Sequence, residues 1–260
     1  MERIKKAWIN LILLGITLAV NALGAFGVIN GMSQKAVSDM YITLITPSPS
    51  TFSIWSVIYI LLFISLITMI VKKEDPYYKR AIDEISTLFW ITCFLNVAWI
   101  VLFSFIQIGI SSIFIFAFVI VLAIILKKLE KIKQPGKWLL PLTFGLYTGW
   151  LVIATVVNIS AWLVKINWQG FGMASDIWAI ITLIVAVGIV YLIITSNKNA
   201  VFPLPVAWAY LGIYQFLNSP EGFQGRYKML QMIALAGMVV LIGIAAIQFY
   251  KNRFRILPRE

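Results

Sequence analysis

Long apolar segments separated by short polar stretches dominate the pattern of this chain. A helix needs about 20 apolar residues to cross the hydrocarbon core of a bilayer, and eight segments come near that length. They lie at about residues 7–28, 52–71, 85–106, 110–126, 138–162, 177–195, 200–217 and 229–250. This pattern predicts an all-α integral membrane protein with eight transmembrane helices.

The basic residues predict how these helices are oriented, because Lys and Arg resist translocation and collect in cytoplasmic loops. Eight crossings with both termini inside place 17 of the 21 basic residues in the cytoplasm. The other four are Lys35, Lys165, Arg226 and Lys228. A seven-helix count that omits the segment with Pro203 and Pro205 would leave the basic cluster at 251–259 outside. We therefore expect a multi-pass protein of the cell membrane with both termini cytoplasmic.

Composition and charge support a membrane location and narrow the partners. Charged residues make up 12% of the chain, whereas soluble proteins have about 25%. The net charge is +11, but the cations lie beside predicted helix ends, where each interacts with anionic headgroups by roughly 1 kcal/mol. We expect membrane lipids as partners and no nucleic acid, and the sequence leaves the oligomeric state open.

Much catalytic and metal chemistry lacks its usual residues in this chain. There is no histidine, which removes His-ligated zinc, His-ligated haem and Ser-His-Asp triads. Apart from those at the chain ends, the acidic residues map to predicted loops or helix ends. Ion-coupled transporters usually bury an ionisable group at mid-membrane, and the sequence places no carboxylate there. We predict no catalytic residues, no metal site and no required cofactor.

Amide side chains are prominent among the polar groups inside the apolar segments. They belong to Asn21, Asn96, Asn158, Gln231 and Gln248. One interpretation is structural, because amides form hydrogen bonds between transmembrane helices worth about 0.6 to 2 kcal/mol. The other is ligand binding, and the choice depends on the neighbours of each amide.

Aromatic residues share helix faces with two of these amides, since residues three or four apart lie on one face. The faces are Phe52, Trp55, Tyr59 and Phe63; Asn96, Trp99 and Phe103; and Tyr147, Trp150, Ala154, Asn158 and Trp162. Gly145 and Gly149 form a GxxxG motif on an adjoining face of the last helix. Aromatic rings in such stripes can stack on a flat ligand.

Tryptophan in a membrane helix often anchors it at the headgroup level. Trp8, Trp138, Trp162 and Trp168 suit that role. Trp55, Trp99 and Trp150 lie further inside their helices, where an indole N–H needs an acceptor or faces a cavity. Tight packing and a ligand pocket are both compatible with these three.

These motifs resemble the tryptophan-rich sensory protein family, also called the translocator protein or TspO/MBR family. The family pattern of a Pro-rich loop and F-x-x-VW-x-x-LY is similar to residues 47–59, with Trp55 and Tyr59 in register. The patterns of its third and fifth helices match Leu95, Asn96, Trp99 and Phe103, and Trp150, Ala154, Asn158 and Trp162. The resemblance covers about residues 7–165.

The resemblance implies a five-helix bundle at residues 1–165, to which residues 166–260 add a three-helix transmembrane extension. It also implies a pocket for a planar apolar ligand, either a tetrapyrrole such as porphyrin or a sterol-like molecule, under a lid at residues 29–51. The pocket positions are Trp55, Tyr59, Asn96, Trp99, Trp150, Ala154 and Asn158. The chain departs from the family at Ser50, where an aromatic residue is expected, and in the predicted helix at 110–126, which has no Trp.

Three functions follow as hypotheses. The first is a receptor or regulator that binds the planar ligand. The second is a carrier for a small uncharged or weakly anionic metabolite, suggested by the additional helices and by the proline-interrupted segment near Pro203. The third, suggested by the resemblance, is degradation of bound porphyrin with light and oxygen. Because ordinary acid–base chemistry lacks a candidate residue, we expect a protein that is not an enzyme.

Overall fold

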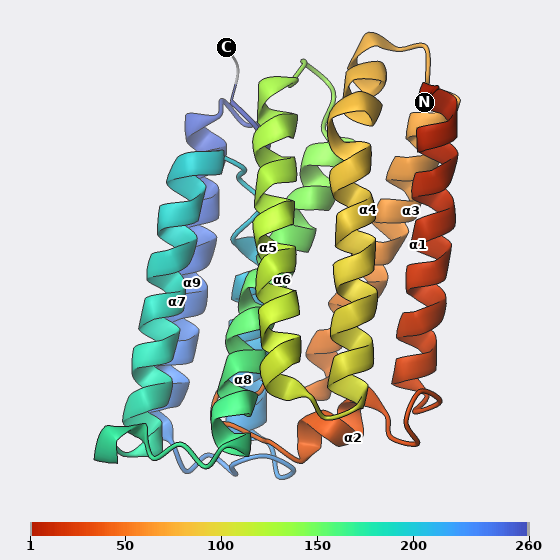
Figure 1. The fold of residues 1–260 in the computed structure, drawn as a ribbon. Coiled ribbons are helices and arrows are strands. Elements are labelled where there is room, and N and C mark those ends of the chain that lie inside the picture. The colour runs from red at the N-terminus through yellow and green to blue at the C-terminus, as the bar shows by residue number, and fades with distance from the viewer. Residues whose placement is uncertain (1, 259–260) are drawn as a thin grey trace.

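The computed structural model describes residues 2–258, which form a bundle of helices (Figure 1). In chain order the elements are α1 (Arg3–Ala25), α2 (Gln34–Asp39), η1 (Pro49–Ser53), α3 (Ile54–Val71), α4 (Pro76–Ser104), α5 (Ile108–Lys131), α6 (Leu139–Lys165), η2 (Gly170–Gly172), α7 (Ser175–Asn197), α8 (Leu204–Asn218) and α9 (Lys228–Lys251). Seven of these helices are long and apolar enough to cross a membrane. An all-α, multi-pass membrane architecture is thus confirmed for the described part of the chain.

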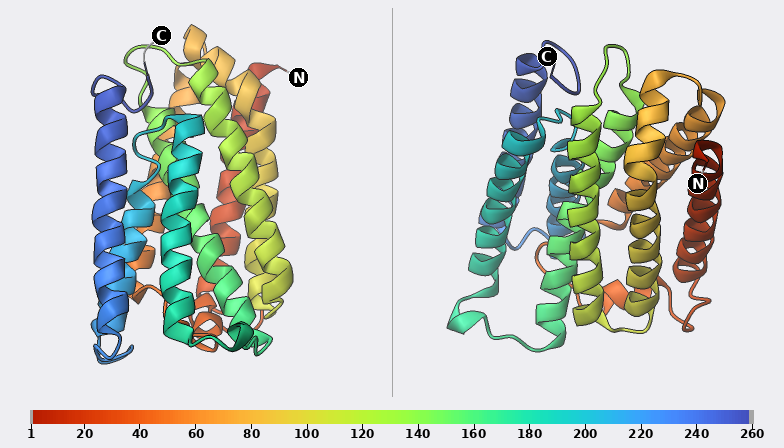
Figure 2. Two further views of the ribbon diagram at one scale, coloured as in Figure 1. Left: turned by 90° about the vertical axis from the view of Figure 1, so that its left-hand side faces the viewer. Right: turned by 45° about the horizontal axis from the view of Figure 1, so that its top comes forward.

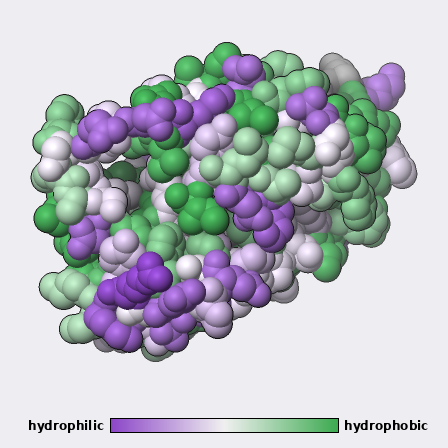
Figure 3. Space-filling view, turned by 90° about the horizontal axis from the view of Figure 1, so that it is seen from below, coloured by the Kyte–Doolittle hydropathy of each residue, from purple (hydrophilic) through white to green (hydrophobic). Residues whose placement is uncertain are grey.

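The long helices run side by side, and the N- and C-terminal ends lie at the same end of the bundle (Figure 1). The loops at 72–75 and 132–138 lie at this end too, together with their basic residues. The opposite end carries the connections at 26–53, 166–174 and 219–227, and its surface mixes hydrophilic with hydrophobic residues (Figure 3). Placing both chain ends on one side agrees with the predicted orientation, and the cytoplasmic assignment of that side stays a prediction.

Helices α1 and α3 to α6 lie together, whereas α7 and α9 form the flank farthest from α1 (Figures 1 and 2). Between them, α8 contacts both α6 and α9. The predicted division into residues 1–165 and 166–260 stays a prediction. What the structure adds is that α8 joins the flank to the other helices.

The segment predicted as a seventh spanning helix at 200–217 is broken. Helix α7 ends at Lys198, whose φ of 52° is left-handed, and α8 begins only at Leu204 and has 15 residues. At 1.5 Å per residue it is about 22 Å long, short of the roughly 30 Å hydrocarbon core. Pro203 and Pro205 explain the late start, because proline lacks an N–H and disfavours a helical residue before it. Instead of eight continuous spans, the chain forms seven spanning helices and one short helix.

Helix α4 differs in the other direction, since it begins at Pro76 rather than near residue 85. Asp75 caps it by accepting a hydrogen bond from the Tyr77 N–H at 2.9 Å. A second hydrogen bond, from Lys137, lowers the pKa of the Asp75 carboxyl. Hydropathy missed this start because the first turns carry charged residues, which pair with neighbouring helices instead of ending the helix. One such pair joins Arg3 of α1 to Asp83 at 2.6 Å.

The irregular residues 198–203 are largely buried, and asparagine side chains bond their backbone. Asn252 donates to the Lys198 carbonyl at 2.9 Å. Asn199 is fully buried and donates to the Pro141 carbonyl of α6 at 2.8 Å. The Ala200 N–H donates to the Ile256 carbonyl at 2.9 Å. Non-helical backbone at membrane depth is tolerated where protein covers it, and α6 and residues 252–256 supply that cover.

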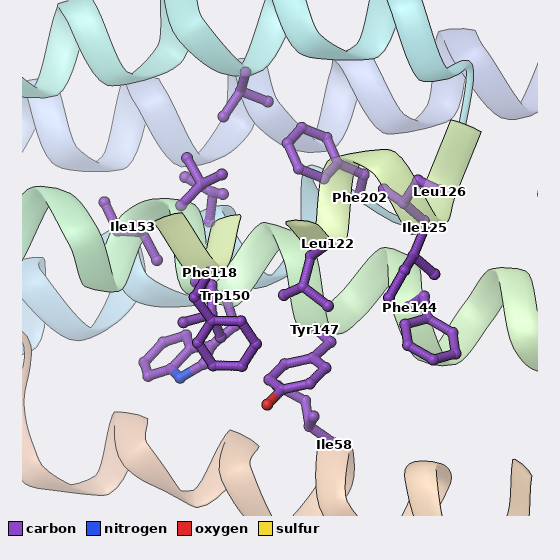
Figure 4. Close-up of a cluster of buried hydrophobic side chains, with 14 of the residues drawn as sticks. Ile58, Phe118, Leu122, Ile125, Leu126, Phe144, Tyr147, Trp150, Ile153 and Phe202 are labelled. Atoms are coloured by element: carbon purple, nitrogen blue, oxygen red, sulfur yellow. The ribbon is translucent and has the colours of Figure 1, made fainter. Parts of the chain in front are cut away.

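The GxxxG motif of α6 is the surface on which residues 199–203 lie. A Cβ on Gly145 would lie 2.6 Å from the Asn199 side chain, and one on Gly149 would lie 2.1 Å from the Phe202 carbonyl oxygen. Small residues of this kind let segments approach closely in membranes. Phe202 itself joins the buried cluster of Phe118 and Tyr147 (Figure 4), whose rings meet edge to face at 5.4 Å.

We predict that Gly149→Ala lowers the free energy of unfolding by about 1 to 3 kcal/mol, because the new methyl group overpacks the contact with Phe202. The matched control is Gly15→Ala in α1, where a Cβ meets no atom within 4 Å. Thermal unfolding in detergent compares the two variants. Equal midpoints for both would contradict the close approach.

Candidate functional site

The Trp55 ring lies at the centre of an aromatic cluster that joins three helices. Trp55 is the second residue of α3, directly after the short helix η1. Its ring stacks on Tyr59 with centroids 5.1 Å apart and an interplanar angle of 18°. The ring of Trp99 on α4 is 6.2 Å away, and those of Tyr147 and Trp150 on α6 are each 6.1 Å away. We call these five residues the aromatic cluster.

A chain of hydrogen bonds runs along one side of the cluster. The Tyr59 hydroxyl donates to Asn21 Oδ1 at 3.0 Å, and Asn21 Nδ2 donates to Asn96 Oδ1 at 2.6 Å. Asn96 Nδ2 then donates to the Tyr147 hydroxyl at 3.3 Å. The chain connects α1, α3, α4 and α6, and it fixes the polar tips of both tyrosines.

Asn158 forms a second polar centre at the other side of Trp99. Its Oδ1 accepts a hydrogen bond from the Trp99 indole N–H at 3.1 Å. Its Nδ2 lies 2.7 Å from Ser112 Oγ and 3.2 Å from Ser111 Oγ on α5. The amide thus holds the Trp99 ring in place and ties α4, α5 and α6 together, which is the structural role expected of a membrane amide.

The structure brings together six of the seven residues named as pocket positions. Trp55, Tyr59, Trp99 and Trp150 contribute rings to the aromatic cluster, while Asn96 and Asn158 hold the side chains beside it. Ala154 lies on α6 between Trp150 and Asn158, about one turn from each, and packs against the core. Whether these residues bind a ligand stays a prediction.

Side chains of the cluster fill its centre themselves. Asn96 is 0% exposed and Trp150 is 2% exposed, so both are fully enclosed. The Trp55 ring lies between those of Trp99 and Trp150 in the region that a flat ligand would have to enter. Trp150 Nε1 is buried and has no hydrogen-bond partner among residues 2–258. The site therefore combines stacked rings with one unpaired indole N–H.

Asn21, Tyr147 and Phe52 belong to the site although they were not among the predicted pocket positions. Asn21 is the central member of the hydrogen-bond chain, and Phe52 meets Trp150 edge to face at 5.9 Å. Each carried a signal in the sequence, since Asn21 is an amide in an apolar helix and the other two extend the aromatic faces. Their assignment needed the relative rotation of α1, α3 and α6.

The loop that precedes Trp55 is held by α8. We call residues 29–51 the lid, as in the prediction, and it includes the short helix α2. The Ser48 N–H donates to the Gly212 carbonyl at 2.9 Å, and Ser48 Oγ donates to Gln215 Oε1 at 3.1 Å. The Trp208 indole donates to the Thr51 carbonyl at 2.8 Å. These contacts give α8 a defined role, because it fixes the turn from which Trp55 enters the cluster.

Together, the fold and the site define a polytopic helical membrane protein with a central aromatic and amide cluster. The profile of the family described as TSPO-like protein matches residues 7–247. The chain therefore belongs to the TSPO-like family, in agreement with the resemblance seen in its motifs. The match extends beyond residue 165 to include α7, α8 and most of α9. No significantly similar protein was found among curated proteins or among solved structures.

We predict that Gly212→Ala loosens the lid, because the new Cβ would lie 1.9 Å from Thr51 Oγ1. The readout is labelling of an Ile45→Cys thiol by a maleimide, since Ile45 is 2% exposed and the native Cys93 is buried. Overpacking by about 1.4 kcal/mol corresponds to roughly tenfold faster labelling. Gly243→Ala on α9, where a Cβ meets no atom within 4 Å, is the control. Identical labelling rates in the two backgrounds would rule out this role of α8.

Proposed function

We propose that the protein is a membrane receptor or regulator that binds a planar, largely apolar molecule, a tetrapyrrole or a sterol-like compound, at the aromatic cluster. The observation that carries the proposal is the meeting of rings from α3, α4 and α6 around Trp55. Aromatic faces stack on flat ligands, and the surrounding amides give the site a fixed orientation. Membership of the TSPO-like family supports the same function.

Binding in this proposal requires the lid to move. Trp55 directly follows η1, and η1 is held by Trp208 and Gly212 of α8. When this turn shifts, Trp55 moves with it, and a flat ligand takes the position between Trp55 and Trp150. The unpaired N–H of Trp150 then finds an acceptor on the ligand, such as a carboxylate, a carbonyl or a ring nitrogen. A ligand with such an edge is favoured over a pure hydrocarbon.

We predict that protoporphyrin IX quenches the tryptophan fluorescence of the purified protein, and that Trp55→Ala and Trp150→Ala each weaken binding by about tenfold. Each substitution removes one stacking face, and about 1.4 kcal/mol corresponds to that factor. Trp138→Phe is the control, because Trp138 is 58% exposed and lies at the N-terminus of α6, away from the cluster. A porphyrin titration by absorbance gives the affinities.

Two results would count against this function. Unquenched emission with both protoporphyrin and a fluorescent sterol would remove the receptor, and equal affinities in all variants would move the site elsewhere. Illumination of the complex provides a separate comparison. An unchanged porphyrin spectrum is the expected result, whereas light-dependent loss of porphyrin would point to the degrading activity instead.

The broken segment before α8 favours a second candidate, a carrier for a small uncharged or weakly anionic metabolite. Interrupted helices often line transport paths, and residues 198–203 form such an interruption beside α6. We expect this function to yield uptake of labelled glycerol or lactate into proteoliposomes above the rate of protein-free vesicles. Rates equal to those of empty vesicles for both probes would leave the receptor as the better assignment.

A further inference from the structure

A groove of about 620 Å³ lies between α5 and α6, outside the aromatic cluster. It is open along one side, where Ile113 and Phe116 are 67% and 55% exposed. Both helices are spanning helices, so this side faces the acyl chains of the bilayer. A molecule can enter the groove laterally from the membrane.

The groove changes from polar to apolar with depth. Gln107 and Lys165 line it where α5 begins and α6 ends, at the same end of the bundle. Further from that end the lining is Ile113, Phe116 and Ile159. At 1.5 Å per residue the apolar part reaches about 9 Å along α6 and about 13 Å along α5. This gradient matches an amphiphile whose head lies at the membrane surface and whose chain points inward.

The polar end of the groove is positively charged and lacks an acidic partner. Lys165 Nζ donates to the backbone carbonyl of Ile106, and no carboxylate in residues 2–258 forms an ion pair with it. Lys35, at the same end of the bundle, is by contrast paired with Asp39. The Trp162 indole N–H beside it has no hydrogen-bond acceptor in the described chain, and Trp162 is 37% exposed. An ammonium and an indole N–H side by side suit a phosphate group.

We propose that the α5–α6 groove binds an anionic phospholipid, with its phosphate at Lys165 and Trp162 and one acyl chain along Ile113 and Phe116. The lateral opening and the depth gradient select a bilayer lipid, and the unpaired ammonium selects an anionic one. The site is distinct from the aromatic cluster, although Ser112 lines the groove and also bonds Asn158 at 2.7 Å. The proposal does not depend on the proposed function.

The test is lipid retention by the full-length protein in native mass spectrometry, after incubation with equal amounts of palmitoyl-oleoyl phosphatidylglycerol and phosphatidylcholine. We expect preferential retention of phosphatidylglycerol. Lys165→Gln lowers that preference about fivefold, in line with the contribution of one cation near anionic lipid, and Lys165→Arg preserves it. Lys228→Gln is the control, since Lys228 is exposed at the same end of the bundle.

A second variant keeps the test decisive if Lys165→Gln fails to fold. Ile113→Trp fills the apolar part of the groove and leaves Lys165 in place, so retention falls although the charge is intact. Trp55→Ala leaves retention unchanged, which separates this site from the aromatic cluster. Equal phosphatidylglycerol retention in the Ile113→Trp variant and the unmodified protein overturns the proposal, as does retention of added oleate in place of the phospholipid.

Discussion

Buried irregular backbone is the constraint on which the rest of this structure depends. A peptide group removed from water needs a hydrogen-bond partner, whether protein or lipid surrounds it. Residues 46–53 and 198–203 are the two segments where this need is greatest, and both meet it through α8 and its neighbours. Glycines on α6 and α8 allow the close approach. The C-terminal helices are therefore part of what shapes the aromatic cluster, in keeping with a family match that includes them.

The filled centre of the cluster bears on which ligands suit it. Trp55 already stacks on Tyr59 and contacts Trp99 and Trp150, so binding exchanges contacts within the protein for contacts with the ligand. Only the difference contributes to affinity. A molecule larger and flatter than an indole gains the most from this exchange, since stabilisation by burial grows with the apolar area covered. The same exchange disfavours small ligands, which cannot replace the contacts that Trp55 gives up.

Periodicity and hydropathy were enough for the membrane class, for the seven spanning helices and for the faces that carry Trp55, Asn96, Trp99 and Asn158. They failed where local chemistry changes the helix. Hydropathy extended a helix through Pro203, and it delayed α4 past its charged first turns, because it measures apolarity and not backbone geometry. The pairing of Asn21 with Asn96 and the contact of Ser48 with Gly212 join residues far apart in the sequence. Such contacts depend on helix rotation and depth, which a single sequence does not encode locally.

The contact between α8 and the lid has a consequence for biosynthesis. Translation proceeds from the N-terminus, so α1 to α6 leave the ribosome before the residues that hold Ser48 and Thr51 exist. Gly212 and Gln215 come later, and Ile256, which bonds Ala200 at the start of that region, later still. The lid is therefore one of the last parts of the molecule to reach its final position, although it belongs to the first fifth of the chain.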